Sequence, residues 1–349
     1  MMINRLLFAI SSICIVSCNL NRDQVTVSTL AGNGRMGFES GRLRESSFSN
    51  PMAVASDGKG NLYIADSRNN LIRKIDREGQ VSTIAGSGAA GSDDGPGRTA
   101  SFFYPQGIAV DKSGNIFIAD THNNLIRKMG LDGMVKTIAG KRIGKSTNQI
   151  DSSVRFDNPS GIAVDDDGDL YVSDWANNLI RKISPEGRVI NIAGNGAPGS
   201  KDGKDSSASF YLPWGIAVDA HKNLYVADCY NNRIRKIDRD GMVTTIAGHN
   251  TKGASNGKGV SASFQHPTGI AVDKKENIYV ADTENNCIRK ISPDGVVSTY
   301  AGNGYRGAAD GPAPDANFYR PYGIVVNDQG DIFVADYENN LIREIRVKK

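Results

Sequence analysis

Six aspartates and six arginines recur along the chain of 349 residues, each arginine seven positions after its aspartate. They are Asp66, Asp120, Asp174, Asp228, Asp282 and Asp336, followed by Arg73, Arg127, Arg181, Arg235, Arg289 and Arg343. These charges could form an active site, but catalysis needs one constellation, whereas a repeated scaffold needs the same brace in each unit. We therefore expect each aspartate to accept backbone N–H bonds in the following turn and each arginine to pair with it.

The sequence contains no complete set of residues for a metal site, a cofactor site or an activated nucleophile. A zinc site needs three converging ligands. The four histidines are His122, His221, His249 and His266. His221 falls in the first hairpin of its repeat, on the opposite face from the others. Asp165 to Asp169 lacks the bidentate glutamate of a calcium loop, and Gly32-x-Gly34-x-x-Gly37 lacks the helix of a dinucleotide fingerprint. No Gly-x-Ser-x-Gly elbow appears, so we predict no catalytic residues, metal or cofactor.

The elements that must position these residues repeat with a period of 54 residues from Val27 onward. Each repeat offers four short apolar runs, which in the second repeat are Gly107 to Asp111, Asn115 to Asp120, Leu125 to Met129 and Met134 to Ala139. Gly and Asn between the runs supply the positive φ of tight hairpins, and continuous apolar runs are typical of strands buried on both faces. The sequence predicts an all-β fold, a six-bladed β-propeller of four-stranded blades over residues 25–349.

The ring is expected to close through its N-terminal strand. The last repeat ends after its third strand candidate, and Val27 to Ala31 aligns with the fourth strand candidate of the next repeat, Val81 to Ala85. Completing the sixth blade with this strand would remove open sheet edges. One phenylalanine per repeat is predicted to plug the core: Phe48, Phe102, Phe156, Phe210, Phe264 and Phe318.

The repeat unit resembles the NHL repeat. The pattern Pro-x-Gly-Ile-Ala-Val-Asp-x-x-Gly-Asn-x-Tyr-Val-Ala-Asp-x-x-Asn-Asn-x-Ile-Arg-Lys is nearly complete in Gly215 to Lys236 and in Gly269 to Lys290. The first repeat departs from it, with Ala53 in place of Gly and Ser56 in place of Val. The resemblance implies a six-bladed binding domain, since NHL propellers include sensor domains and protein- or RNA-binding domains. It also implies an alternative, because lactonases and an amidating lyase have similar folds.

The N-terminal segment resembles a bacterial lipoprotein signal. Met1 to Arg5 is basic, Leu6 to Val16 is an apolar run too short to span a bilayer, and small residues precede Cys18. Residues 1–17 are therefore expected to be a signal peptide, Cys18 to be lipidated, and residues 18–24 to form a tether. Two acyl chains on this cysteine would anchor the protein stably. The expected location is the cell envelope, on the periplasmic or exposed side of the outer membrane.

Two variable positions break the strict repeat, one after each proline and one after each turn aspartate. The connectors between repeats and the Asp-x-x-Asn-Asn turns should share one face, because strand direction alternates. Both tryptophans of the chain fall in these positions. The predicted binding residues on this connector face are Trp175, Trp214, Tyr230, Tyr322 and Tyr337. Trp and Tyr offer rigid amphipathic contact area, although they could equally pack the mouth of the channel.

The sequence therefore predicts a lipid-anchored, monomeric binding platform for an envelope or extracellular protein, peptide or glycan. The alternative is a propeller hydrolase or lyase with a metal in the channel. Net charge is +3 and the basic residues are spread along the chain, so no nucleic-acid arm stands out. A lipidated, exported protein would also rarely meet RNA. Cys229 and Cys287 lie in adjacent repeats, which leaves a disulfide between them open.

Overall fold

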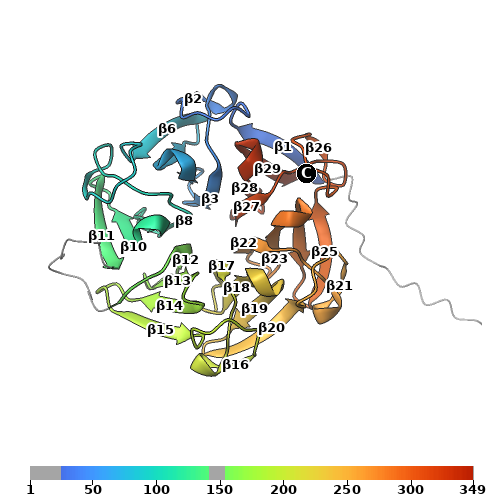
Figure 1. Ribbon diagram of the computed structural model, residues 1–349. Coiled ribbons are helices and arrows are strands. Elements are labelled where there is room, and N and C mark those ends of the chain that lie inside the picture. The colour runs from blue at the N-terminus through green and yellow to red at the C-terminus, as the bar shows by residue number, and fades with distance from the viewer. Residues whose placement is uncertain (1–24, 141–153, 349) are drawn as a thin grey trace, which may run out of the picture.

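The computed structural model describes residues 25–140 and 154–348. These residues form a ring of six antiparallel sheets around a central axis (Figure 1). Each sheet is one blade, and its strands run outward from the axis in chain order. This confirms the all-β, six-bladed propeller that the 54-residue period predicts. The signal segment, Cys18 and the tether lie outside the described residues.

The innermost strands begin at or near the repeated proline and line the axis. They are β3 (Pro51–Ser56), β8 (Gly107–Val110), β12 (Pro159–Val164), β17 (Pro213–Val218), β22 (Pro267–Val272) and β27 (Pro321–Val326). The second strands, each buried at all five residues, end on the repeated aspartate. They are β4 (Leu62–Asp66), β9 (Ile116–Asp120), β13 (Leu170–Asp174), β18 (Leu224–Asp228), β23 (Ile278–Asp282) and β28 (Ile332–Asp336).

The third and fourth strands complete each blade toward its rim. The third are β5 (Leu71–Ile75), β10 (Leu125–Met129), β14 (Leu179–Ile183), β19 (Arg233–Ile237), β24 (Cys287–Ile291) and β29 (Leu341–Val347). The fourth are β6 (Gln80–Ala85), β11 (Met134–Gly140), β15 (Val189–Ala193), β20 (Met242–Gly248), β25 (Val296–Ala301) and β1 (Val25–Ala31).

Five sheets also carry a two-residue strand at the rim, which the four-strand prediction did not anticipate. These strands are β2 (Gly41–Arg42), β7 (Gly95–Pro96), β16 (Gly203–Lys204), β21 (Gly257–Lys258) and β26 (Gly311–Pro312). They belong to the connectors, which cross the rim of the next blade before entering its centre. In the sheet of β12 to β15, the equivalent positions fall in residues 141–153, outside the described ranges. The short strands cover the sheet edges that would otherwise be open.

Short 3-10 helices mark the turns and connectors. Five follow the repeated aspartate: η3 (Ser67–Asn69), η4 (Thr121–Asn123), η6 (Cys229–Asn231), η8 (Thr283–Asn285) and η9 (Tyr337–Asn339). Three lie in connectors: η2 (Leu43–Glu45), η5 (Asp205–Ser207) and η7 (Gly259–Ser261). No helix among residues 25–140 and 154–348 is long and apolar enough to cross a membrane.

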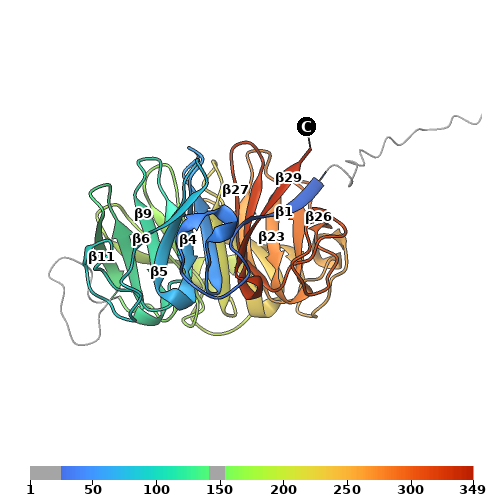
Figure 2. The same cartoon turned by 90° about the horizontal axis from the view of Figure 1, so that it is seen from above.

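Ring closure by the N-terminal strand is confirmed. Strand β1 pairs antiparallel with β29, with Thr26 opposite Arg346, and on its other side with the short strand β26. Sheet six is therefore built from both ends of the described chain, as Figure 1 shows where the blue strand joins the red blade. In the edge-on view, β29 runs toward one face of the ring (Figure 2). This face carries the hairpins that join the first and second strands of each blade, which we call the first hairpins.

The hydrophobic core consists of clusters between neighbouring blades. One cluster joins Tyr63 and Ile72 of the first blade to Phe102, Ile108 and Ile118 of the second. The repeated phenylalanines are all buried, as predicted. Innermost strands also approach each other closely: a Cβ on Gly215 would lie 2.2 Å from the carbonyl oxygen of Thr268. Glycine at this position therefore lets the blades converge on the axis.

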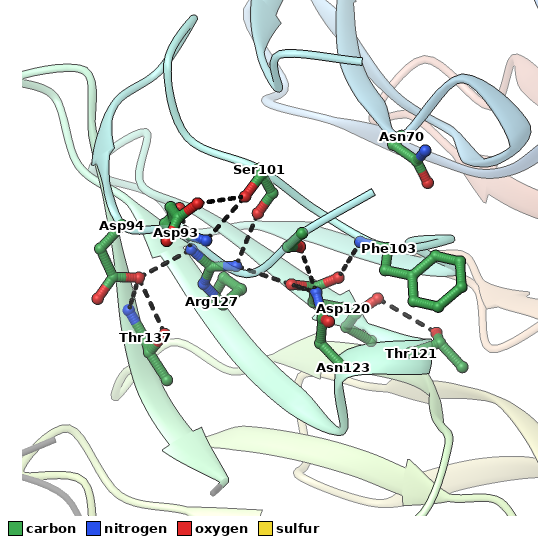
Figure 3. A network of polar contacts seen from close by, with 12 residues as sticks. Asn70, Asp93, Asp94, Ser101, Phe103, Asp120, Thr121, Asn123, Arg127 and Thr137 are labelled. Atoms are coloured by element: carbon green, nitrogen blue, oxygen red, sulfur yellow. Dashed lines mark hydrogen bonds and ion pairs between the residues drawn. The ribbon is translucent and has the colours of Figure 1, made fainter. Parts of the chain in front are cut away.

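The Asp–Arg pair braces the fold as predicted, but the backbone N–H that the aspartate accepts comes from the preceding connector and not from the following turn, as the second blade shows (Figure 3). Asp120 accepts the backbone N–H of Phe103 at 2.8 Å through Oδ1, and Asn123 and Arg127 through Oδ2 at 2.8 and 2.7 Å. Arg127 also donates to the carbonyl oxygen of Ser101 and lies over the Phe102 ring, 5.2 Å from its centroid. The brace thus fastens the connector to the blade it enters.

Candidate functional site

The connectors and the Asp-x-x-Asn-Asn turns share one face of the ring, as predicted. In each blade the second residue after the turn aspartate donates its backbone N–H to the connector, for example His122 to Phe103 at 3.1 Å and Tyr230 to Tyr211 at 3.2 Å. These contacts place the variable residues of turn and connector side by side. We call this surface the connector face.

In several blades the two variable positions hold hydroxyls that join one blade to the next. After the turn aspartate, Thr121 donates to the carbonyl oxygen of Pro159 at 2.8 Å, and Thr283 donates to that of Pro321 at 2.7 Å. After the proline, Ser160 donates to the carbonyl oxygen of Trp214 at 3.1 Å. The ordinary role of these positions is therefore to link adjacent blades.

Aromatic side chains replace these hydroxyls at four of the predicted binding residues, and their rings contact one another. The centroids of Trp175 and Trp214 are 5.8 Å apart, those of Trp214 and Tyr322 are 5.5 Å apart, and those of Tyr322 and Tyr337 are 4.8 Å apart. The Tyr337 hydroxyl lies 3.1 Å from that of Tyr104. These four side chains are half-buried. We call them, together with Tyr104, the aromatic patch: Trp175, Trp214, Tyr322, Tyr337 and Tyr104.

The aromatic patch crosses the mouth of the channel. Trp214 belongs to the fourth blade and Tyr322 to the sixth, so their contact bypasses the fifth blade. Tyr104 precedes the second blade and meets Tyr337 of the sixth, which bypasses the first. Rings from non-adjacent blades therefore meet across the mouth of the channel, and the rings of the four predicted residues are half-buried.

Tyr230, the fifth predicted binding residue, makes no ring contact with the patch among the described residues. It is 44% exposed and stacks on His266, with centroids 4.8 Å apart, and it also contacts Tyr211. These three rings form a second, smaller group on the connector face, at the same three positions of the repeat as Phe103, His122 and Tyr104. The sequence places Tyr230 one position beyond the variable slot, and there its ring contacts His266 and Tyr211 instead of the patch.

Sequence reasoning missed Tyr104 and His122, whose rings stack at 4.9 Å. A signal existed, because the residue before each proline also varies between repeats: Asn50, Tyr104, Asn158, Leu212, His266 and Arg320. All six have positive φ, a backbone conformation that favours Gly or Asn over aromatic residues. Tyr104 adopts this conformation, at φ 54°, and its hydroxyl meets that of Tyr337 within the patch.

The charged groups of the connector face lie beside the patch. Arg320 donates to Glu284 at 2.7 Å and lies 3.6 Å from Glu338, so its charge is balanced. Burial raises the pKa of Tyr104, with the neighbouring Tyr337 hydroxyl as the second cause, and burial also raises that of Tyr322. Burial lowers the pKa of His122. The patch is therefore a neutral surface at pH 7.

Titratable groups elsewhere serve the fold. Burial raises the pKa of Asp66, Asp282 and Asp336 to about 6, against the opposing effect of their Asn and Arg partners. Cys229 and Cys287 are both buried free thiols, which answers the question of a disulfide between them. Residues 25–140 and 154–348 contain no group of three or more His, Cys, Asp or Glu that could hold a metal ion.

Comparison with known proteins identifies the repeat. The NHL repeat pattern matches residues 156–183, 210–237, 264–291 and 318–345. The chain carries NHL repeats. The pattern of the teneurin NHL domain matches residues 88–158. NHL repeat-containing protein 2 of Bos taurus is 30% identical over 321 residues, which cover 81% of this chain and 44% of that protein. The chain spans less than half the length of the first curated relatives that it matches.

Solved structures share the architecture of this NHL-repeat propeller. An auxiliary nutrient binding protein from Bacteroides thetaiotaomicron superposes with a TM-score of 0.72 at 19% identity, over 93% of this chain and 77% of that chain. A gluconolactonase from Xanthomonas campestris superposes with a TM-score of 0.61 at 14% identity, over 92% and 89% of the two chains. At these identities the similarity shows the fold, which binding proteins and enzymes both use.

Proposed function

We propose that this NHL-repeat propeller is a binding platform, and that an envelope or extracellular protein, peptide or glycan docks on the aromatic patch of the connector face. A lipid on Cys18 would hold the platform, as a monomer, at the membrane. The fold it shares with an auxiliary nutrient binding protein is compatible with this role. The proposal rests chiefly on the replacement of blade-linking hydroxyls by contacting aromatic rings.

That replacement has a cost for the scaffold. Thr121 and Thr283 each make a hydrogen bond to the next blade that Trp175 and Tyr337 do not make among the described residues. A buried hydrogen bond contributes about 1 kcal/mol to stability. A sequence that keeps its other repeat positions so strictly has no structural need to vary here. Half-buried Trp and Tyr on a rigid scaffold are the side chains that most often dominate binding energy.

The two tryptophans make the patch directly observable. Trp175 and Trp214 are the only tryptophans of the chain, and their rings contact each other. Emission from selectively excited tryptophan therefore reports on the patch alone, without a contribution from the 12 tyrosines. Titration with neutral oligosaccharides, and separately with envelope peptides, should give a saturable change in emission for one of the two series.

A double variant separates binding from folding. Trp175→Ala with Trp214→Ala should remain folded in a thermal melt and lose binding of that series by calorimetry, since each such anchor contributes about 2 kcal/mol. Tyr305→Ala, at a side chain 77% exposed outside the patch, is the matched control and should bind normally. Unchanged binding by the folded double variant would refute the site. A collapse of stability by roughly 3–5 kcal/mol would show that the rings are core.

The membrane anchor has its own test. Cys18→Ser should move the protein from the membrane fraction to the soluble fraction, because the acylated thiol is lost. Mass spectrometry of the wild-type N-terminus should show a diacylated cysteine with residues 1–17 removed. A Cys18→Ser protein that still sediments with membranes would show that something other than this lipid holds it.

A further inference from the structure

A second set of repeated residues lies between the blades toward the face of the first hairpins. In the first blade, Lys74 Nζ lies 5.8 Å from the centroid of the Tyr63 ring, and the Tyr63 hydroxyl donates to Asp57. Five blades share this arrangement of carboxylate, aromatic ring and ammonium. Their lysines are Lys74, Lys128, Lys182, Lys236 and Lys290, each over the ring opposite it in the sheet.

The sixth blade reverses the charge of this set. Glu344 occupies the position of the lysine, opposite Phe333 in the sheet, and Asn327 occupies that of the aspartate. No cation of the described chain lies over the Phe333 ring. The sixth blade thus keeps the ring, lacks both the ammonium and the carboxylate of the other five blades, and holds a new carboxylate, Glu344, in the place of the ammonium.

Glu344 is buried and poorly paired. Its side chain is 8% exposed, and burial raises its pKa. Arg346 Nη2 lies 2.8 Å from Glu344 Oε1, but this ion pair lacks hydrogen-bond geometry, and Oε1 accepts no hydrogen bond among the described residues. Arg346 itself is 59% exposed and also lies 3.6 Å from Asp331. Among the described residues, an exposed arginine is therefore the one ion-pair partner of this buried carboxylate.

A cavity of about 520 Å³ opens at this carboxylate, between the sixth and first blades. We call it the seam cavity. Its lining includes the apolar side chains Leu30, Leu43, Leu62 and Phe333, the carboxylates Asp76, Asp331 and Glu344, and the cations Lys59, Arg77 and Arg346. A smaller cavity of about 370 Å³ lies at the second blade, and its lining includes Lys128. Phe117 and Phe333 are the two positions where Phe replaces the repeated Tyr. The two linings share four equivalent positions, among them those of Lys128 and Glu344, so the charge at that position differs in sign between the two cavities.

We propose that the seam cavity binds a small organic cation, an amine carried on an apolar or aromatic stem. The ammonium would lie between Glu344 and the Phe333 ring, where the protein's own lysine lies in the other blades, and the stem would contact Leu30 and Leu43. Attraction between a cation and an aromatic face adds to the charge pairing, more so where water is excluded. The bound amine would displace Arg346 from Glu344.

Phenethylamine is a suitable probe, and 2-phenylethanol is its uncharged counterpart. Calorimetry on the full chain should show saturable binding of one equivalent of phenethylamine and at least tenfold weaker binding of the alcohol. Glu344→Lys restores the residue of the other five blades, so it should fold normally in a thermal melt and abolish binding. Arg346→Gln removes the competing cation and should tighten binding several-fold.

Each contrary result overturns the proposal. Absence of binding to the wild type, equal binding of amine and alcohol, or binding that survives in folded Glu344→Lys would exclude the assigned site. If Glu344→Lys fails to fold, Glu344→Gln takes its place, and unchanged affinity in that isosteric variant would be equally decisive. The site is separate from the aromatic patch, so tryptophan fluorescence under the same titration should stay constant.

Discussion

Asn340 Oδ1 accepts a hydrogen bond from the backbone N–H of Asn50 at 2.9 Å, although 290 residues separate them in the chain. The same bond joins every neighbouring pair of blades: the second Asn of each turn accepts the N–H before the next blade's proline, as Asn70 does from Tyr104 at 2.8 Å. Asn340 and Asn50 make the last of these six clasps, and they close the ring on the connector face.

Removing the closing clasp should destabilise the ring. Asn340 has φ 55°, so Asn340→Gly keeps the backbone conformation and removes only the side chain. The buried N–H of Asn50 would lose its partner, at a cost of about 1–3 kcal/mol in the free energy of unfolding. Urea denaturation measures this. Glu276→Gly, at an exposed side chain with φ 61°, is the matched control and should cost little, and equal m-values would show that the variants unfold alike.

Strand β1 should be essential to closure. Deleting residues 1–31 removes β1 and leaves β29 with an open edge, so the melting temperature of the whole ring should fall in a single transition. Deleting residues 1–24 is the matched control, since β1 remains, and its melting curve should equal that of the mature protein. Identical melting of the two truncated proteins would contradict closure through β1.

The buried brace should carry more stability than any exposed charge. Arg127 and Asp120 are both fully buried, so Arg127→Met leaves an unpaired carboxylate in the core and should cost about 3–5 kcal/mol. Arg239→Met, at an exposed arginine, should stay within about 0.5 kcal/mol. Adding Asp120→Leu to Arg127→Met should recover part of the loss in urea denaturation, because the pair is coupled. Equal effects of the two arginine variants would refute the role of the brace.

Much of this molecule is predictable from the sequence because its units are identical. The period gives the blade count, and the alignment of Val27 with Val81 gives the closing strand. The brace follows from the fixed spacing of Asp120 and Arg127. These features depend on local geometry repeated six times, so one unit stands for all.

The contacts across the axis were not predictable in the same way. Trp214 and Tyr322 lie two blades apart, and their contact depends on how far each side chain reaches over the channel. Tyr230 points elsewhere because of a one-residue step in the turn. Glu344, by contrast, breaks a visible series of five lysines, and the sequence could have revealed the seam cavity through it. The sequence thus shows which residues break a strict repeat, even where it does not show what those residues contact.

His122, one of the histidines of the connector face, should respond to pH. Burial lowers the pKa of His122 below its ordinary value of 6.5, so the unfolded chain binds a proton more readily than the folded one. Stability contributed by neutral His122 is therefore present above pH 6.5 and is lost as the pH falls through the lowered pKa. Titration of the His122 ring protons by NMR measures the shift. His122→Gln should reduce the loss of melting temperature between pH 7.5 and 5.5, whereas His221→Gln, at an exposed side chain, should not.

Substitutions of Trp175 should distinguish its contribution to stability from its contribution to binding. Its indole Nε1 is buried and has no hydrogen-bond partner among the described residues. Trp175→Phe keeps a ring in contact with Trp214 and removes this unpaired donor, so the free energy of unfolding should change by less than about 1 kcal/mol. Trp175→Ala should cost more, because it removes the ring as well.

Trp175→Phe, which should change stability little, should weaken binding clearly if Nε1 donates to the ligand. Because Nε1 is buried in the free protein, a partner's carbonyl, hydroxyl or carboxylate oxygen could accept from it only after the indole turns outward on binding. Trp175→Phe would then weaken binding by about tenfold, which corresponds to about 1.4 kcal/mol. Calorimetry on Trp175→Phe beside Trp214→Phe measures this, since the Nε1 of Trp214 is not among the buried unpaired atoms. Equal losses in both variants would indicate that ring area alone binds the partner. A Trp175→Phe protein that binds normally but unfolds more easily would show that the indole serves the fold.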